Sequence, residues 1–150
     1  LDIPIIRQDI AGRRAAPGYR LLSDVEAPLP PGAAAALDLA PGSVWRHIRA
    51  LHLADGAPFC LEDRWLDPDR AAGQRFDTIS ANEWLVRQVP YTEGSLAWSA
   101  IALPQDAAAA LGQPPGAAAL AIDRTTRGEA GPITCVRLTY APGYRMEAAL

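Results

Sequence analysis

The stretch LHLADGAPFCLEDRWLDP, residues 51–68, predicts a β-hairpin and thereby indicates the fold class. Two runs rich in apolar residues flank an Asp-Gly dipeptide, which is typical of tight hairpin turns. Alternate residues of a strand share a face, so Cys60, Glu62 and Arg64 are expected to point to one side of the second run. Two strands joined by so short a turn pair antiparallel, which makes an antiparallel sheet the expected centre of the fold.

Whether His52 joins this face depends on the length of the turn. A two-residue loop places His52 on the side of Phe59, away from Glu62. A three-residue loop, with Gly56 left-handed in a bulge, places His52 beside Glu62 and Arg64. The composition of the turn leaves both arrangements open.

Proline and glycine divide the rest of the chain into short segments. Strands are expected at residues 18–30, 43–54, 58–66, 95–103, 118–127 and 133–141. Short helices are expected at residues 33–39, 79–89 and 105–112, with a helix or an irregular arm at 4–14. Because most strands follow one another through tight turns, we predict an α+β fold with an antiparallel sheet of about six strands flanked by short helices.

Composition and charge narrow the class of protein. The chain has 150 residues, of which 49% are hydrophobic, so we expect a single domain over residues 1–150. The net charge is −3, and the 14 basic residues, all arginine, form no run longer than Arg13-Arg14. A surface that binds nucleic acid needs concentrated positive charge, so direct binding to nucleic acid is not expected. No segment approaches the roughly 20 apolar residues of a membrane span, and no signal peptide is visible, so we expect a cytoplasmic protein with no membrane partner.

The sequence contains no recognisable pattern of catalytic or metal-binding residues. Cys60 and Cys135 lie in separate apolar runs, as expected for buried thiols in a reducing compartment. His47 and His52 have opposite parity on one strand, so they cannot bind one ion together, and no serine-hydrolase motif is present. We therefore predict no catalytic residue, no metal and no cofactor. The charged hairpin is compatible with solvated ion pairs, worth about 0–1 kcal/mol each, or with one wall of a ligand pocket.

Four motifs occur in an order that resembles a known family. LEDRWLDP (61–68), VPYTEG (89–94), IDRTTR (122–127) and PGYRM (142–146) are similar to segments of the UTRA effector-binding domain of GntR-superfamily repressors of the HutC subfamily. The resemblance extends from about residue 18 to residue 147 and is greatest to the histidine-utilisation repressors. It implies a chorismate-lyase-like fold, a homodimer, and a sensor that regulates DNA binding by an upstream winged helix-turn-helix domain, which we presume to be missing from this chain.

The resemblance also implies where the effector binds. The ligand cleft of the family corresponds to Ala50, His52, Glu62 and Tyr144 in this sequence. Sugar-phosphate-sensing relatives have arginines where Ala50 and His52 stand, so a phosphorylated sugar is disfavoured and urocanate is the implied effector. The further candidates for contacts with the ligand are Arg64, Thr92, Arg137 and Arg145. Of these, the three arginines could hold its carboxylate.

This assignment favours the three-residue turn, which places His52 and Glu62 on one face. It makes a sensor the leading hypothesis. The alternative is a chorismate-lyase-like enzyme that acts on a ring carboxylic acid. A purely structural dimerisation domain is a third possibility.

Overall fold

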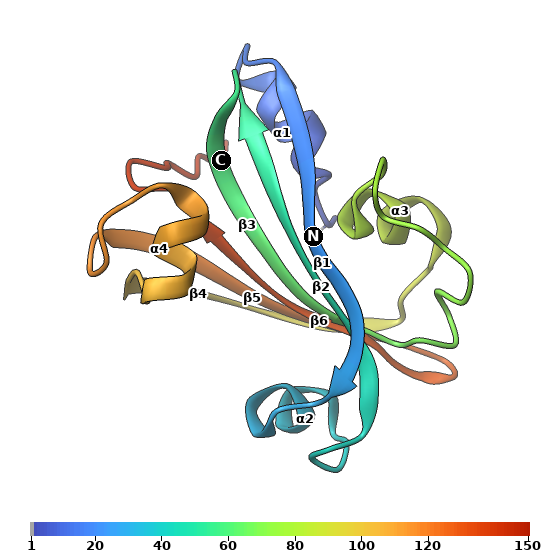
Figure 1. The fold of residues 1–150 in the computed structure, drawn as a ribbon. Coiled ribbons are helices and arrows are strands. Elements are labelled where there is room, and N and C mark those ends of the chain that lie inside the picture. The colour runs from blue at the N-terminus through green and yellow to red at the C-terminus, as the bar shows by residue number, and fades with distance from the viewer. Residues whose placement is uncertain (1) are drawn as a thin grey trace.

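The computed structural model describes residues 2–150, which form one six-stranded antiparallel sheet and four short helices (Figure 1). The strands are β1 (Pro17–Pro28), β2 (Val44–Ala54), β3 (Ala57–Leu66), β4 (Glu93–Ala102), β5 (Ala118–Gly128) and β6 (Gly131–Tyr140). The helices are α1 (Ile6–Gly12), α2 (Pro31–Leu37), α3 (Ala81–Gln88) and α4 (Gln105–Leu111). The predicted α+β class and the predicted order of elements are confirmed.

The strand order in the sheet is β1-β2-β3-β6-β5-β4. Two hairpins, β2-β3 and β5-β6, meet at the centre through the β3-β6 pair, while β1 and β4 form the two edges. The register places Leu138 of β6 opposite Glu62, and Ala50 of β2 on its other side. The charged face of the hairpin therefore lies in the middle of the sheet, where flanking strands bury it.

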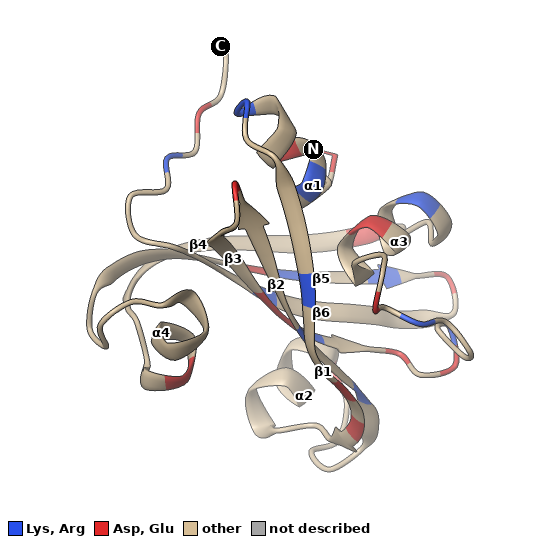
Figure 2. Cartoon of the chain, turned by 45° about the horizontal axis from the view of Figure 1, so that its top comes forward, with Lys and Arg blue, Asp and Glu red and all other residues tan. Residues whose placement is uncertain are grey.

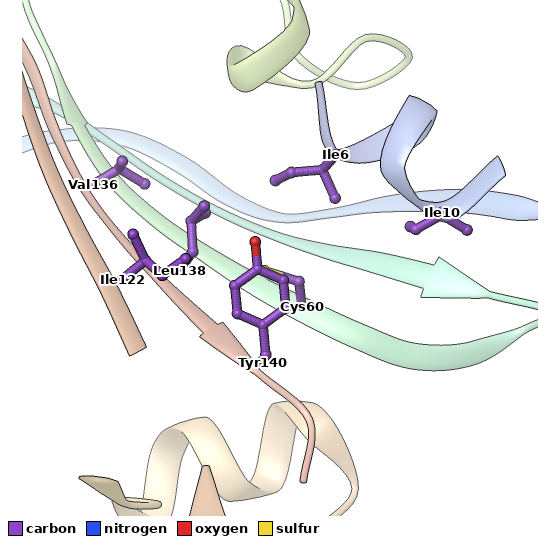
Figure 3. Packing of buried hydrophobic residues seen from close by; sticks show 7 residues of the cluster. All are labelled: Ile6, Ile10, Cys60, Ile122, Val136, Leu138 and Tyr140. Carbon is purple, nitrogen blue, oxygen red and sulfur yellow. The ribbon is translucent and has the colours of Figure 1, made fainter. Parts of the chain in front are cut away.

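Helices cover both faces of the sheet (Figure 1). Helices α1 and α3 lie on the face that carries Glu62, and α2 and α4 lie on the opposite face. Figure 3 shows Ile6 and Ile10 of α1 with the buried sheet residues that they cover, which are Cys60, Ile122, Val136, Leu138 and Tyr140. The apolar face of α1 thus covers the sheet near the end of the β2-β3 hairpin.

The helix ends follow local rules that the sequence already indicated. Ser80 accepts a hydrogen bond of 3.0 Å from the backbone N–H of Glu83, as a helix N-cap does. Helix α4 is followed by its C-cap residue Gly112, whose φ of 65° is left-handed, a conformation that is strained for residues with a Cβ. Among residues 2–150 no helix is long and apolar enough to cross a membrane.

The turn between β2 and β3 has two residues, and the three-residue loop favoured above is wrong. Asp55 and Gly56 have φ values of 51° and 80°, as a type I′ turn requires. The pairing then shifts one step from the turn, because Leu53 pairs with Pro58 whereas His52 pairs with Cys60. A β-bulge within β3, not a longer loop, supplies the extra residue.

This bulge determines which side chains meet. Phe59 is the residue left without a partner, and the shift of one position brings His52 to the face of Glu62. Phe59 itself was expected on the opposite face, yet its ring contacts Tyr140 and Tyr144 edge-on at centroid distances of 5.6 Å. The bulge therefore places both Phe59 and His52 on the side covered by α1.

Charged residues of both signs are interspersed over the molecule, and no region of the cartoon is uniformly basic (Figure 2). Many of them form ion pairs, such as the pair between Arg46 and Asp24 at 2.6 Å. The described part of the chain therefore offers no concentrated basic face of the kind that nucleic-acid binding requires.

Candidate functional site

Three of the candidate residues, His52, Glu62 and Arg64, form one buried hydrogen-bonded chain. His52 Nε2 lies 2.7 Å from Glu62 Oε1, and Arg64 Nε donates to Glu62 Oε2 at 2.8 Å. Arg64 Nη1 also donates to the Thr134 hydroxyl at 3.1 Å, and that hydroxyl donates to the Trp65 carbonyl at 2.7 Å. Each member of the chain thus fixes the orientation of the next.

The carboxylate of Glu62 is held in its ionised form. Complete burial by itself would raise the pKa of Glu62, but the charge of Arg64 and the hydrogen bonds from His52 and Arg64 outweigh it and lower that pKa to about 2. An ionised carboxylate only accepts hydrogen bonds, so His52 Nε2 carries the proton that lies between the two groups. Both oxygens of Glu62 are therefore occupied by protein donors.

Two cavities lie at the two ends of this chain. The first, which we call the α3 cavity, has a volume of about 480 Å³ and is lined by Arg64 together with Leu85 and Val86 of α3. The second, the His52 cavity, has a volume of about 400 Å³ and includes Tyr19, whose hydroxyl donates to the Phe76 carbonyl at 2.6 Å. Glu62 lines neither cavity.

The α3 cavity contains a second buried arginine, Arg124 of β5, which was not among the predicted site residues. Its only sequence signal is its position in IDRTTR, where it shares a face with Ile122 and Thr126. Register explains why it comes close to Arg64, because Val136 of β6 pairs with Arg64 on one side and with Arg124 on the other. Strand order was needed to find this residue.

The other candidates lie away from this chain. Arg137 points to the opposite face of the sheet, where it forms a bidentate pair with Asp123 at 2.8 Å. Tyr144 stacks on Tyr140 at a centroid distance of 3.8 Å, outside both cavities. The structure does not bring these residues to His52 and Glu62.

Two further candidates also lie elsewhere. Arg145 is exposed and pairs with Glu147 at 3.0 Å. Thr92 lines a third cavity of about 360 Å³, which adjoins the α3 cavity and shares Arg124 and Tyr91 with it. Of these two, only Thr92 lies near the chain of buried charges.

The lining of the α3 cavity is suited to holding an anion, although Asp2 also lies in it. Its wall contains two arginines, the hydroxyls of Thr126 and Thr134, and apolar side chains of α3. None of the described residues that line it is a serine, cysteine or histidine, so no nucleophile stands beside a histidine base there. The arrangement can hold a small acid with a flat or apolar body.

Comparison with known proteins assigns the family. The UTRA domain family matches residues 12–147. The C-terminal domain of the histidine utilization repressor from Pseudomonas syringae is 27% identical, with a TM-score of 0.80 over 89% of this chain and 98% of that one.

More distant solved structures share the fold. The effector domain of PhnF from Mycobacterium smegmatis is 18% identical, with a TM-score of 0.79 over 99% of this chain and 98% of that one. A GntR-family transcriptional regulator from Enterococcus faecalis is 22% identical, with a TM-score of 0.70 over 91% and 98% of the two chains. No curated protein sequence matches. Because the family match covers most of its length, the chain belongs to the UTRA domain family, as its motifs predicted.

Proposed function

We propose that this chain is the effector-sensing domain of a GntR/HutC-type repressor of histidine utilisation, and that urocanate is its effector. The observation that carries the proposal is the buried chain from His52 through Glu62 to Arg64, which ends in a cavity of about 480 Å³. This volume lies within the range of about 300–1,000 Å³ that is typical of small-molecule sites. The 27% identity to a histidine utilization repressor supports the same assignment.

Urocanate matches both the arginines and the apolar side chains that line the α3 cavity. Its carboxylate is a partner for a guanidinium group, and its flat conjugated body fits against Leu85, Val86 and Val89. Glu62 was expected to line the ligand cleft, and we propose a different role for it. Glu62 lines neither cavity and is engaged by His52 and Arg64, so it acts by positioning Arg64.

The N-terminal segment offers a route from effector to DNA. Asp2 and Ile3 line the α3 cavity, and Asn82 of α3 binds the same segment by accepting from Ile6 N at 2.8 Å and donating to the Pro4 carbonyl at 3.0 Å. We propose that an upstream winged-helix domain is joined through this segment. An effector that contacts it would then bias the DNA-binding arrangement, and couplings of this kind are typically about 1–3 kcal/mol.

The geometry disfavours the enzyme alternative. A lyase that acts on a ring acid would need a general acid or base in contact with its substrate. Glu62, the buried carboxylate bound to the cavity residue Arg64, does not line the α3 cavity, and both its oxygens are engaged in hydrogen bonds. The regulator names of the solved relatives point the same way.

We further propose that the domain forms a homodimer through the edge strand β4. From Gly94 to Ala102 this strand has no charged residue, and Trp98 is 50% exposed. The other edge, β1, carries prolines, charges and a bulge near Leu22, which are features that protect an edge from further pairing. An uncharged strand can pair antiparallel with a second copy around a two-fold axis without burying an unpaired charge.

Sedimentation tests the dimer. The chain is expected to sediment as a dimer, and Trp98→Glu as a monomer, while Val25→Glu on β1 keeps the wild-type state. A dimer that survives in Trp98→Glu would remove β4 from the interface.

Calorimetric titration tests the effector. Saturable binding of urocanate is expected, with no binding of glucosamine 6-phosphate or chorismate. Binding of chorismate together with release of a product would instead establish the enzyme. Absence of urocanate binding would refute urocanate as the effector.

A further inference from the structure

Arg124 is a buried cation that has no partner among the residues that the structure describes. It is 8% exposed, and among residues 2–150 it forms no hydrogen bond or ion pair. Among residues 2–150, eleven other arginines form ion pairs, mostly at the surface, where such pairs contribute little. An unpaired buried charge is costly, so its presence at a cavity wall calls for a ligand.

The surroundings of Arg124 increase this cost. Burial lowers the pKa of the Arg124 guanidinium, and the positive charge of Arg64 lowers it further. Glu62 supplies one negative charge for the two arginines, and its oxygens are bound to His52 and Arg64. Asp2 also lines the cavity, but it is exposed and forms no ion pair with Arg124. The site therefore keeps an uncompensated positive charge.

The register sets the spacing of the two guanidinium groups. Arg64 and Arg124 lie on the same face, two strands apart, with Val136 between them. Figure 3 shows that Val136 points to the side of the sheet covered by α1. Two strand spacings amount to about 10 Å at the backbone, so side chains that lean together from both strands can hold one small group between them. Nη2 of Arg64 has no partner among the described residues.

We propose that Arg64 and Arg124 together form the binding site for the anionic group of the effector, a carboxylate that bridges the two guanidinium groups in the α3 cavity. This inference rests on the proposed sensor function and adds the site of charge recognition. Thr126, next to Arg124 along the same face of β5, offers a further hydroxyl. Arg124 is thereby a specificity-determining residue, and Glu62 is the positioning residue that fixes Arg64.

The test compares Arg124→Gln with the matched control Arg137→Gln, which removes an arginine of β6 on the opposite face. Each variant and the wild type are titrated with urocanate and with its neutral amide. A hydrogen bond to a charged group contributes about 1.5–3 kcal/mol, so Arg124→Gln is expected to lower urocanate affinity about ten- to a hundredfold. Arg137→Gln should bind urocanate as the wild type does, and the amide should bind wild type and Arg124→Gln equally.

A second measurement separates a binding role from a structural one. Without ligand, Arg124→Gln is expected to unfold in urea at the same or a higher concentration than the wild type, because it removes a buried charge that no carboxylate compensates. A large loss of stability together with the loss of affinity would overturn the proposal, since it would make Arg124 a structural residue.

A further experiment distinguishes failure of urocanate as the effector from failure of Arg64 and Arg124 as an anion site. If urocanate does not bind, thermal unfolding is followed in acetate and in phosphate. Stabilisation of the wild type but not of Arg124→Gln by these anions would support the anion site and reject only urocanate. Equal responses of the two proteins to every anion would overturn the anion site and leave the sensor function untouched.

Discussion

The hairpin β2-β3 carries the same trio of histidine, carboxylate and arginine on both of its faces. On one face, His52 and Arg64 bind Glu62 at 2.7 and 2.8 Å, and all three side chains are at most 3% exposed. On the other, His47 lies 2.7 Å from Asp63 and Arg49 lies 3.4 Å from it, with side chains that are 24–34% exposed. The residue types and the central position of the carboxylate are alike, whereas the surroundings differ.

The helices above the first trio, and not its residue types, account for its burial. Helices α1 and α3 close over the Glu62 face, which removes water and leaves a cavity at each end of the buried chain. The Asp63 face is only partly covered, so water screens its ion pairs and they are expected to contribute little. The predictions below test this contrast between the two carboxylates.

The largest effect is expected from Glu62→Gln compared with Asp63→Asn. Glu62→Gln leaves Arg64 buried without a charged partner, and breaking a buried pair in this way costs about 3–5 kcal/mol in the free energy of unfolding. Asp63→Asn should cost at most about 1 kcal/mol, as for exposed pairs. Urea denaturation of both variants measures the contrast, and equal small losses would mean that Glu62 is not isolated from water.

Lowering the pH should gradually remove the contribution of ionised Glu62 to the free energy of unfolding. The folded-state pKa of Glu62 is lowered from 4.5 to about 2, so its stabilising effect is complete above pH 4.5 and is lost as the pH falls towards 2. At about 1.4 kcal/mol per pKa unit, this loss is roughly 3 kcal/mol.

Urea midpoints measured from pH 5 to 2 report this loss. Glu83, whose pKa is also lowered to about 2, chiefly by its hydrogen bond from Arg7, adds to it, so Glu83→Gln serves as the matched variant. If the urea midpoint of the wild type depended on pH as weakly as that of Glu62→Gln, the lowered pKa of Glu62 would be contradicted.

The smallest effect is expected from the histidines. His52→Phe keeps a ring of similar shape but removes the hydrogen bond to buried Glu62, at a cost of about 1–3 kcal/mol. His47→Phe preserves the stacking on Trp65, whose ring centroid lies 4.2 Å away, and should cost less than about 1 kcal/mol. Thermal unfolding of the two variants measures this difference. A larger loss of stability in His47→Phe than in His52→Phe would show that the trio around Asp63 is the more strongly coupled.

Local signals were sufficient to predict most elements of this fold. The prolines and glycines at element ends, Ser80 before α3 and Gly112 after α4 all act within a few residues, so they could be read directly from the chain. The bulge at Phe59 could not, because it depends on how β3 pairs with β2 over several positions. The prediction that His52 and Glu62 meet was right for a different reason from the one first given.

The sequence by itself determined that Glu62 and Arg64 share a face of a strand, because side chains alternate with a period of two. It did not determine that this face would be the buried one, since both faces of the β2-β3 hairpin carry a carboxylate and an arginine. The tertiary structure decided that by bringing α1 and α3, which begin 56 residues before and 19 residues after Glu62, over the same side of the sheet. It also brought Arg124 beside Arg64, because β6 pairs with both β3 and β5, and such long-range pairing leaves no local pattern in the chain.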